Sequence, residues 1–235
     1  QATRKAGNTA GLVVLATGLG KTWLSAFDSC SSEDFVRVLF VAHRDEILTQ
    51  ALNTFRRIRP KASLGRYTGQ EKNPSADILF ASIQTMGQVK HLRQFAPQEF
   101  DYIIVDEFHH AAATTYRKLI DYFEPQFLLG LTATPERMDG GDLLGLRQEN
   151  LALRDDLFEG IPSELLPPFK YFGVPDAVDY ENIPWRSRSF DPDALTTALA
   201  TQTRAENALE QYRDKAGEKT LVFCCSQKHS DFMAG

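Results

Sequence analysis

Cysteine is scarce in this 235-residue sequence. It occurs only at Cys30, Cys224 and Cys225, and two of these are adjacent. There is no CxxC pair and no paired Cys/His spacing, so we expect neither a disulfide framework nor a structural zinc site. No apolar run approaches the roughly 18 residues of a membrane span, and the first residues, Gln1 to Lys5, do not resemble a signal peptide. These absences favour a reducing compartment and no membrane partner.

An excess of positive charge is also lacking. Lys plus Arg number 26 and Asp plus Glu number 31, which gives a formal net charge of −5. Taken alone, this balance argues against a protein that coats nucleic acid through bulk positive charge. The acidic excess is local, however, because residues 139–195 carry 12 acidic and 5 basic side chains, whereas residues 1–60 carry 5 and 8. The global charge is therefore a poor guide to any single face of the molecule.

Short apolar runs alternate with helical patterns over the first 137 residues. Continuous apolar runs of this length are typical of strands buried on both faces, as in a parallel sheet. Helices are predicted between them at 44–58 and 110–123, so the alternation predicts an α/β layered fold. The predicted strands are residues 11–16, 36–42, 77–82, 101–106 and 126–132.

The character of the chain changes after Arg137. Residues 139–168 combine a Gly-Gly pair, three prolines and many carboxylates, which predicts a connector with some helix. A second unit is expected from residue 169, with strands at 169–174 and 220–225 and a long helix at 194–212. Ser226 is expected to cap a final helix.

Residues 16–22 read Ala-Thr-Gly-Leu-Gly-Lys-Thr and stand between a predicted strand and an apolar helix, which is the context of a phosphate-binding loop. Gly18 and Gly20 allow backbone N–H groups to face phosphate oxygens, and the helix N-terminus adds its dipole. Lys21 can neutralise phosphate charge, and Thr22 can place its hydroxyl on Mg²⁺. The strict GxxxxGK[ST] pattern is not met, because Leu15 replaces its first glycine. A glycine-containing turn with an incidental lysine is the alternative.

A second candidate site follows the predicted strand at 101–106, which ends in two carboxylates, Asp106 and Glu107. Buried carboxylates are costly unless they have a task or a partner. Asp106 can hold Mg²⁺, and Glu107 can orient and deprotonate an attacking water. His109 and His110 do not give the HExxH zinc spacing. A strand edge followed by a solvated helix start is the alternative.

A third segment, residues 131–137, follows an apolar strand with small hydroxyl residues. Thr132 and Thr134 have the right size to relay hydrogen bonds between neighbouring strand ends. Thr134 is also a suitable helix N-cap with Pro135 at the first helical position. The two interpretations are compatible.

Taken in order, ATGLGKT, VAHRDEIL, ASIQTM, DEFHH and LTATPER resemble the motifs of helicase and translocase superfamily 2. The resemblance is strongest to the branch shared by type III restriction subunits and DNA-repair helicases. It implies an α/β fold of RecA-like, P-loop NTPase lobes, each a parallel sheet flanked by helices, with ATP and Mg²⁺ as cofactors. It also implies three segments: an ATP-binding first lobe at 1–138, a connector at 139–168 and the incomplete start of a second lobe at 169–235.

The resemblance also implies roles for single residues. ATP would be bound by Thr17, Gly18, Leu19, Gly20, Lys21 and Thr22, with Lys21, Asp106 and Glu107 catalytic and with Thr22 and Asp106 on the metal. Asp106, Glu107 and His109 would form a DEAH-type motif, spelled DEFH here, in which His109 couples nucleotide state to Thr132 and Thr134. Nucleic acid would be contacted by Arg44, Ser82, Gln84 and Thr85. Solvation in the first turn of a helix is the alternative for Arg44, and helix capping is the alternative for Ser82 and Thr85.

The implied reaction is ATP-dependent translocation or unwinding of nucleic acid, with DNA favoured over RNA. A fused or associated nuclease or specificity domain and a bacterial cytosolic or nucleoid location are further implications. A translocase holds its strand through phosphate contacts from backbone N–H, hydroxyl and Arg groups, so a net charge of −5 is compatible with binding. Trp185 has the chemistry to stack on a base, although ordinary packing is favoured.

The departures from the family pattern limit the expected activity. Residues 221–226 resemble motif IV, but no residue after Ser226 matches motifs V and VI, and Arg186, Arg188, Arg204 and Arg213 precede motif IV. An arginine finger contributes about 10³–10⁵ in rate, so the chain by itself is expected to bind nucleotide and to hydrolyse it slowly or not at all.

Two other functions stay open at this point. One is a P-loop switch or remodelling ATPase that does not act on nucleic acid, and the other is a non-catalytic binding lobe. The HRDEIL and SIQTM segments argue against the first. The intact Lys21, Asp106 and Glu107 argue against the second.

Overall fold

The computed structural model describes residues 2–108, 113–133, 151–155, 168–176, 178–186 and 189–235. It divides into two compact units, unit 1 at Gln1–Phe169 and unit 2 at Lys170–Gly235. None of the helices in the described ranges is long and apolar enough to cross a membrane.

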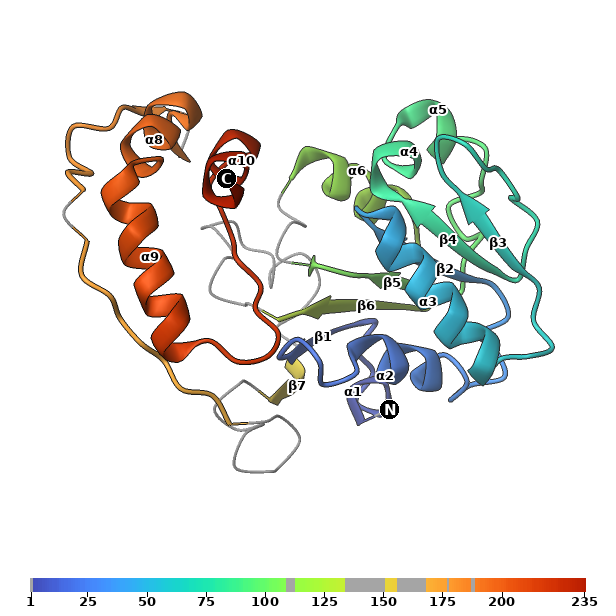
Figure 1. Cartoon of the computed structure of the whole chain (residues 1–235). Helices are drawn as coiled ribbons and strands as arrows, with labels where there is room; N and C mark the ends of the chain where they lie inside the picture. Colours follow the sequence, from blue (N-terminus) through green and yellow to red (C-terminus); the bar gives the residue numbers. More distant parts are fainter. Residues whose placement is uncertain (1, 109–112, 134–150, 156–167, 177, 187–188) are drawn as a thin grey trace. The chain divides into compact units, whose positions relative to one another are not determined.

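Unit 1 is built on a seven-stranded sheet in the order β3-β4-β2-β5-β6-β1-β7, in which all neighbours are parallel (Figure 1). The central strands have no exposed residue, which is why their sequences are continuous apolar runs. The strands are β1 Ala10–Leu15, β2 Val38–Ala42, β3 Leu64–Tyr67, β4 Ile78–Ser82, β5 Tyr102–Val105, β6 Phe127–Thr132 and β7 Leu151–Asp155.

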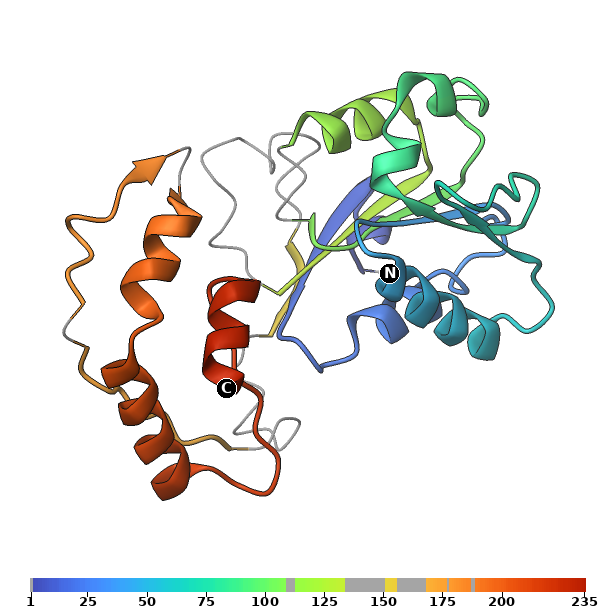
Figure 2. The same cartoon turned by 45° about the horizontal axis from the view of Figure 1, so that its top comes forward.

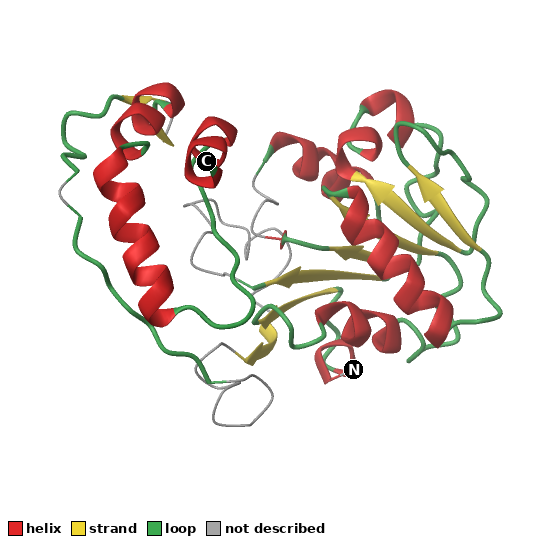
Figure 3. Ribbon diagram, in the orientation of Figure 1, coloured by secondary structure: helices red, strands yellow, loops and turns green. Residues whose placement is uncertain are grey.

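Helices cover both faces of this sheet, as Figures 2 and 3 show. One apolar cluster joins one face of the sheet to α2 and α3 through residues such as Ala26, Leu48 and Phe55. A second cluster joins the opposite face to α4, α5 and α6 through residues such as Met86 and Leu119. The helices of unit 1 in the described ranges are α1 Ala2–Lys5, α2 Lys21–Asp28, α3 Asp45–Ile58, α4 Ile83–Met86, α5 Val89–Leu92 and α6 Thr114–Tyr122.

The α/β fold expected from the sequence is confirmed for unit 1. The five predicted strands correspond to β1, β2, β4, β5 and β6, and the helix predicted at 44–58 corresponds to α3. The connector predicted at 139–168 contains a strand rather than only loop and helix, because β7 adds to the sheet edge beside β1. The edge strand β3 and the short helices α4 and α5 were not predicted.

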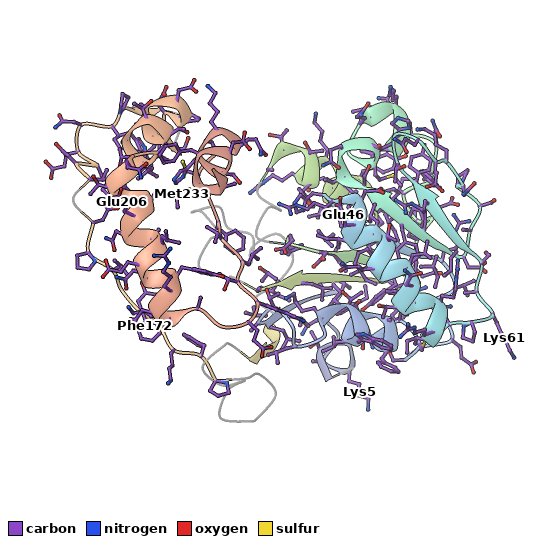
Figure 4. The ribbon with its side chains drawn as sticks, in the orientation of Figure 1. Lys5, Glu46, Lys61, Phe172, Glu206 and Met233 are labelled. Atoms are coloured by element: carbon purple, nitrogen blue, oxygen red, sulfur yellow. The ribbon has the colours of Figure 1, made fainter. Side chains whose placement is uncertain are left out.

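Unit 2 contains three helices and a small hairpin within its described residues. The strands β8 (Trp185–Arg186) and β9 (Ser189–Phe190) pair in antiparallel orientation. They precede α8 (Pro192–Leu199), α9 (Gln202–Lys215) and α10 (Gln227–Ala234). Glu206 of α9 and Met233 of α10 lie on an open groove of about 930 Å³ between these two helices (Figure 4).

Several predictions for unit 2 were wrong. Residues 169–174 and 220–225 do not form strands, and Leu221, Val222 and Phe223 are 78%, 63% and 88% exposed. A strand needs a neighbour to complete its backbone hydrogen bonds, and within the described part of this unit β8 and β9 pair only with each other. The long helix predicted at 194–212 is broken where Thr201 adopts an extended conformation. The cap on α10 is confirmed, since the Ser226 side chain accepts a hydrogen bond from the His229 N–H.

Candidate nucleotide-binding site

The segments that follow β1, β5 and β6 carry most of the residues predicted to bind and hydrolyse nucleotide. These three strands are parallel neighbours, with Val105 of β5 and Leu12 of β1 both paired to Gly130 of β6. Their carboxyl ends therefore meet at one edge of the sheet, which is where ligands bind in open α/β sheets. The sheet topology brings residues 16–22, Asp106, Glu107 and Thr132 to this edge.

The loop after β1 has the backbone of a phosphate cradle. Gly18 and Gly20 have φ values of 94° and 82°, in the left-handed region that favours glycine. The Leu19 N–H donates to the Ala16 carbonyl at 3.2 Å, and Gly20 accepts from the Leu24 N–H at 2.9 Å as α2 begins. The loop thus leads directly into the N-terminus of an eight-residue helix, where free N–H groups and the helix dipole favour an anion.

Lys21 lies at the first position of α2 and turns back onto its own loop. Its ammonium donates to the Leu15 carbonyl at 3.0 Å and to the Ala16 carbonyl at 3.5 Å. Burial lowers the pKa of Lys21, while the charges of Asp106 and Glu107 act against this change. The ammonium is therefore within electrostatic reach of both carboxylates and makes neutral contacts that a phosphate could replace.

Asp106 and Glu107 follow β5 directly. Asp106 is 7% exposed, and burial raises its pKa to about 6 despite the hydrogen bond from the Glu107 N–H to its Oδ1 at 3.0 Å. Glu107 has a φ of 52°, a left-handed conformation that is uncommon for a residue other than glycine. The pair thus combines a buried carboxylate, which a cation would stabilise, with a partly exposed one on a strained backbone.

The aromatic residue inside the DEFH motif lies against the neighbouring strand. Phe108 is 7% exposed, and a Cβ added at Gly130 would meet its ring carbons at 2.6, 2.8 and 3.0 Å. The absence of a side chain at Gly130 is therefore what allows the ring to lie over β6. This contact connects the motif after β5 to the strand that ends in Thr132.

The three residues predicted to couple nucleotide state to the strand ends have different outcomes. Thr132 is fully buried at the end of β6. His109 and Thr134 lie outside the described residues.

The residues predicted to contact nucleic acid lie after β2 and β4, which also pair side by side with Ala42 opposite Ser82. Arg44 is exposed and precedes α3. The Gln84 amide donates to the His43 carbonyl at 2.8 Å, which ties the two segments together.

The Ser82 side chain does not cap the helix that follows it. Ser82 donates to the Thr85 hydroxyl at 3.0 Å, and neither Ser82 nor Arg44 makes a side-chain cap hydrogen bond to the helix that it precedes. Helix capping was the alternative for Ser82 and Thr85, whereas solvation was the alternative for Arg44, whose side chain is exposed. The nucleic-acid contacts of these residues stay predictions. Thr85 is buried, whereas Gln84 and Arg44 are exposed.

The donor set at the carboxyl edge fits a nucleotide with Mg²⁺. Mg²⁺ is usually held by one or two carboxylates together with substrate phosphates rather than by a full protein cage. Among the described residues there is no group of three or more His, Cys, Asp or Glu side chains suited to a metal. Asp106 and the Thr22 hydroxyl would hold the ion, and Lys21 would face the phosphates.

Sequence reasoning missed two features of this site. The contact of Phe108 with Gly130 joins residues 22 positions apart and leaves no local signal. Tyr116 of α6 is 4% exposed, and within the described part of the chain its hydroxyl has no hydrogen-bond partner. The helical spacing marks Tyr116 as a core residue but gives no hint of an unsatisfied hydroxyl.

Comparison with known proteins gives one family match. The family described as type III restriction enzyme, res subunit, matches residues 1–137. A type I restriction enzyme EcoAI endonuclease subunit of Escherichia coli is 28% identical over 256 residues, which covers 94% of this chain and 30% of that protein. A DNA 3'-5' helicase XPB of Kineococcus radiotolerans is 30% identical over 229 residues, which covers 90% of this chain and 39% of that protein. The chain thus spans about a third of the length of these relatives.

Solved structures show the same fold. The helicase domain of Pyrococcus furiosus Hef superposes with a TM-score of 0.50 at 23% identity and covers 65% of this chain and 36% of that one. At this identity the likeness establishes the fold alone, an α/β lobe of the RecA-like type.

Proposed function

The chain belongs to the family of type III restriction enzyme res subunits, and on that premise we propose that it is the nucleotide-binding part of an ATP-dependent nucleic-acid translocase or helicase. One observation supports this proposal above the others. The phosphate loop, with Lys21 turned onto its own carbonyls, lies within electrostatic reach of Asp106 and Glu107 at a single sheet edge. The charges of this arrangement fit a phosphate group beside Lys21 and a cation on the carboxylates.

In the proposed reaction the loop residues 17–22 bind the phosphates of ATP through backbone N–H groups, and Lys21 exchanges the Leu15 carbonyl for a phosphate oxygen. Asp106 and Thr22 would hold Mg²⁺, which would supply positive charge beside the phosphates of ATP. Glu107 orients the attacking water and accepts its proton. Thr132 and the residues His109 and Thr134 relay the result to the neighbouring strand ends.

The proposed substrate is a nucleic-acid strand, and we favour DNA because relatives of this chain are named as DNA helicases and restriction subunits. Arg44, Ser82, Gln84 and Thr85 lie at or after the ends of two adjacent strands. Arg44 and Gln84 offer an exposed guanidinium and an exposed amide, whereas the Thr85 hydroxyl is buried and accepts from the Ser82 hydroxyl. Such groups hold phosphates without reading base sequence. A nuclease or specificity domain as partner, a cytosolic location and the assignment of unit 2 to a second lobe are parts of the same proposal.

The proposed nucleic-acid contact is tested by the salt dependence of binding. Each phosphate contact contributes about 0.7–0.9 to the slope of log K against log salt concentration. We expect Arg44→Ala to weaken binding of labelled single-stranded and duplex DNA. It should also reduce the magnitude of this slope by about 0.7–0.9, the contribution of one phosphate contact. Arg56→Ala is the matched control, because Arg56 is another exposed arginine, located in the last turn of α3.

The two alternatives correspond to other outcomes of this experiment. Binding of ATP without measurable affinity for DNA or RNA would point to a switch or remodelling ATPase. Equal effects of Arg44→Ala and Arg56→Ala would show that binding depends on diffuse charge and not on the segment after β2. Stronger binding of RNA than of either DNA would correct the substrate while leaving the site in place.

A further inference from the structure

Unit 2 holds a cysteine and a histidine in direct contact. Cys225 immediately precedes Ser226, the N-cap of α10, and His229 lies in the first turn of that helix. The distance from Cys225 Sγ to His229 Nδ1 is 3.4 Å. The cysteine is exposed, whereas His229 is only 9% exposed. An accessible sulfur is thus backed by a buried ring nitrogen, which is the arrangement of a nucleophile with an adjacent base.

A backbone hydrogen bond assigns the role of the nitrogen that faces the sulfur. The Cys225 N–H donates to His229 Nδ1 at 3.4 Å. A ring nitrogen that accepts a hydrogen bond carries a lone pair, so the neutral imidazole holds its proton on Nε2. Nδ1 is therefore the nitrogen that can take up a proton, and it is the one beside the Cys225 thiol.

Two hydroxyls hold the start of α10 in place. Ser226 Oγ accepts from the His229 N–H at 3.1 Å and lies 2.7 Å from Thr196 Oγ1 of α8. Thr196 is buried and donates to the Pro192 carbonyl at 2.7 Å, so the Ser226 hydroxyl is the donor to Thr196. Thr196 Oγ1 also lies 3.8 Å from Cys225 Sγ. These contacts tie the first turn of α10 to α8 and keep the imidazole beside the thiol.

The chemistry of this pair is that of a reactive thiol. An ordinary thiol is only a few per cent thiolate at neutral pH, and the thiolate is the nucleophile. A base in contact with the sulfur takes the proton as the sulfur attacks, and the N–H groups at the start of an eight-residue helix stabilise the negative charge that develops there. The nearest printed charge is the Lys228 ammonium, which is paired with Asp193 at 3.2 Å.

We propose that Cys225 is a reversible modification site that reacts with low-molecular-weight disulfides, with His229 as its base. His229 Nδ1 takes the thiol proton, the Cys225 sulfur attacks one sulfur of the disulfide, and the S–S bond of the disulfide breaks. The other half leaves as a thiolate, which the imidazolium protonates. Cys225 is oxidised to a mixed disulfide and the leaving half is reduced to a thiol, so the disulfide is the only co-reactant. The proposal concerns unit 2 alone and does not depend on the nucleotide site.

The neighbouring Cys224 does not displace this product. Consecutive Cα atoms are about 3.8 Å apart, whereas the Cα atoms of a disulfide usually lie about 4.4–6.8 Å apart. A disulfide between Cys224 and Cys225 would therefore be strained. The mixed disulfide is the expected end product, and a thiol reductant should reverse it.

The test compares two single-cysteine forms of the full chain. One carries Cys30→Ser with Cys224→Ser and retains Cys225, and the other carries Cys224→Ser with Cys225→Ser and retains Cys30. Cys30 is the matched control, because it is also exposed but its thiol donates to the Ala26 carbonyl at 3.5 Å, which cannot take up a proton. With the neutral reagent dithiodipyridine at pH 7, we expect Cys225 to react about tenfold or more faster than Cys30.

Two further substitutions in the form that retains Cys225 separate the base from nearby charge. His229→Asn keeps an acceptor for the Cys225 N–H but supplies no base, so its rate should fall about tenfold, to that of Cys30. Lys228→Ala removes the adjacent exposed ammonium and should leave the rate within about twofold, because the reagent is neutral. With glutathione disulfide and the wild-type chain, mass spectrometry should show one glutathione adduct, located at Cys225.

Equal rates for Cys225 and Cys30 would overturn the proposal, and this comparison does not depend on how well His229→Asn folds. A fast Cys225 that His229→Asn does not slow, in a variant with the parent's melting temperature, would overturn the role of the imidazole. An equal loss in Lys228→Ala would assign the reactivity to charge instead of the base. A disulfide between Cys224 and Cys225 as the main product would overturn the mixed disulfide.

Discussion

Replacing Gly130 by alanine tests the contact between the DEFH motif and β6. The added Cβ would lie 2.6 Å from Phe108 Cγ, 2.8 Å from Cδ2 and 3.0 Å from Cδ1. Real Cβ atoms essentially never approach other atoms to less than about 3.0 Å, so the ring or the strand must move. The ring cannot move freely, because Phe108 is buried against the sheet and is attached to the strained residue Glu107.

The expected cost is that of overpacking a core, about 1–3 kcal/mol. For a unit of this size each kcal/mol lowers the melting temperature by about 2–4 °C, so a fall of about 2–12 °C is expected. The matched control is Gly69→Ala, since a Cβ at Gly69 meets nothing within 4 Å. Denaturant unfolding of the same variants gives the free energies directly.

A double-mutant cycle identifies the partner of the new methyl group. Phe108→Ala removes the three ring carbons that the new Cβ would meet, so the loss of unfolding free energy in the double variant Gly130→Ala with Phe108→Ala should be smaller than the sum of the single losses by about 1 kcal/mol or more. Two results would refute the reasoning. One is a Gly130→Ala variant as stable as Gly69→Ala. The other is a double variant whose loss of unfolding free energy equals the sum of the losses of the two single variants.

Three further predictions concern other parts of the chain. Burial opposes ionisation of Asp28, but hydrogen bonds from Arg4 and Tyr102 outweigh it and hold the pKa of Asp28 below its ordinary value. This stabilisation is therefore present above about pH 4 and is lost as the pH falls. The free energy of unfolding, measured by denaturant titration at several pH values, should fall less steeply with acid for Asp28→Asn than for the wild type. Because burial raises the pKa of Asp106 from 3.8 to about 6, its charge destabilises the nucleotide-free protein at neutral pH. Asp106→Asn should raise the free energy of unfolding at pH 7.5 by up to about 3 kcal/mol, and this gain should vanish toward pH 4. The same variant should lose the part of its nucleotide affinity that depends on Mg²⁺. An unchanged stability at pH 7.5 would contradict this reasoning. Ser226→Ala should destabilise α10 by about 1 kcal/mol through loss of its cap, measured as faster amide exchange in the first turn of that helix.

The sequence predicted unit 1 well because its central strands are apolar on both faces. A run such as Val-Leu-Phe-Val-Ala in β2 has one stable environment, the middle of a covered parallel sheet. The same reasoning does not identify edge strands, because they are not covered on both sides. In β3 only Gly65 and Tyr67 are buried, and alternate residues are partly exposed, so its pattern carries little apolar signal.

Unit 2 shows the limit of the same reasoning. Residues 220–225 are as apolar as a buried strand, yet Phe223 is 88% exposed. An apolar run records a preference for burial, whereas a strand also needs a neighbour whose position the run does not encode. The helix break at Thr201 likewise depends on backbone conformation that apolar spacing does not reveal.

The candidate site was predictable where its chemistry is local. Gly18, Gly20, Lys21 and Thr22 stand together in the sequence, and the left-handed glycines agree with the loop expected from them. The position of Phe108 over Gly130 and the unpaired hydroxyl of Tyr116 result from packing between distant segments. No local pattern encodes them, because they depend on how β5, β6 and α6 meet.

Calorimetric titration of the chain with a slowly hydrolysed ATP analogue and Mg²⁺ tests the central claim most directly. Lys21→Ala removes the ammonium of the proposed phosphate site, and Lys61→Ala is the matched control because Lys61 projects outward beyond α3 (Figure 4). A lost hydrogen bond between charged groups corresponds to about 10- to 150-fold in affinity. We predict saturable binding by the wild type and by Lys61→Ala, with a loss of at least tenfold for Lys21→Ala. Equal affinity in all three proteins, or no binding by the wild type, would contradict the assignment of residues 17–22 as a nucleotide-binding loop.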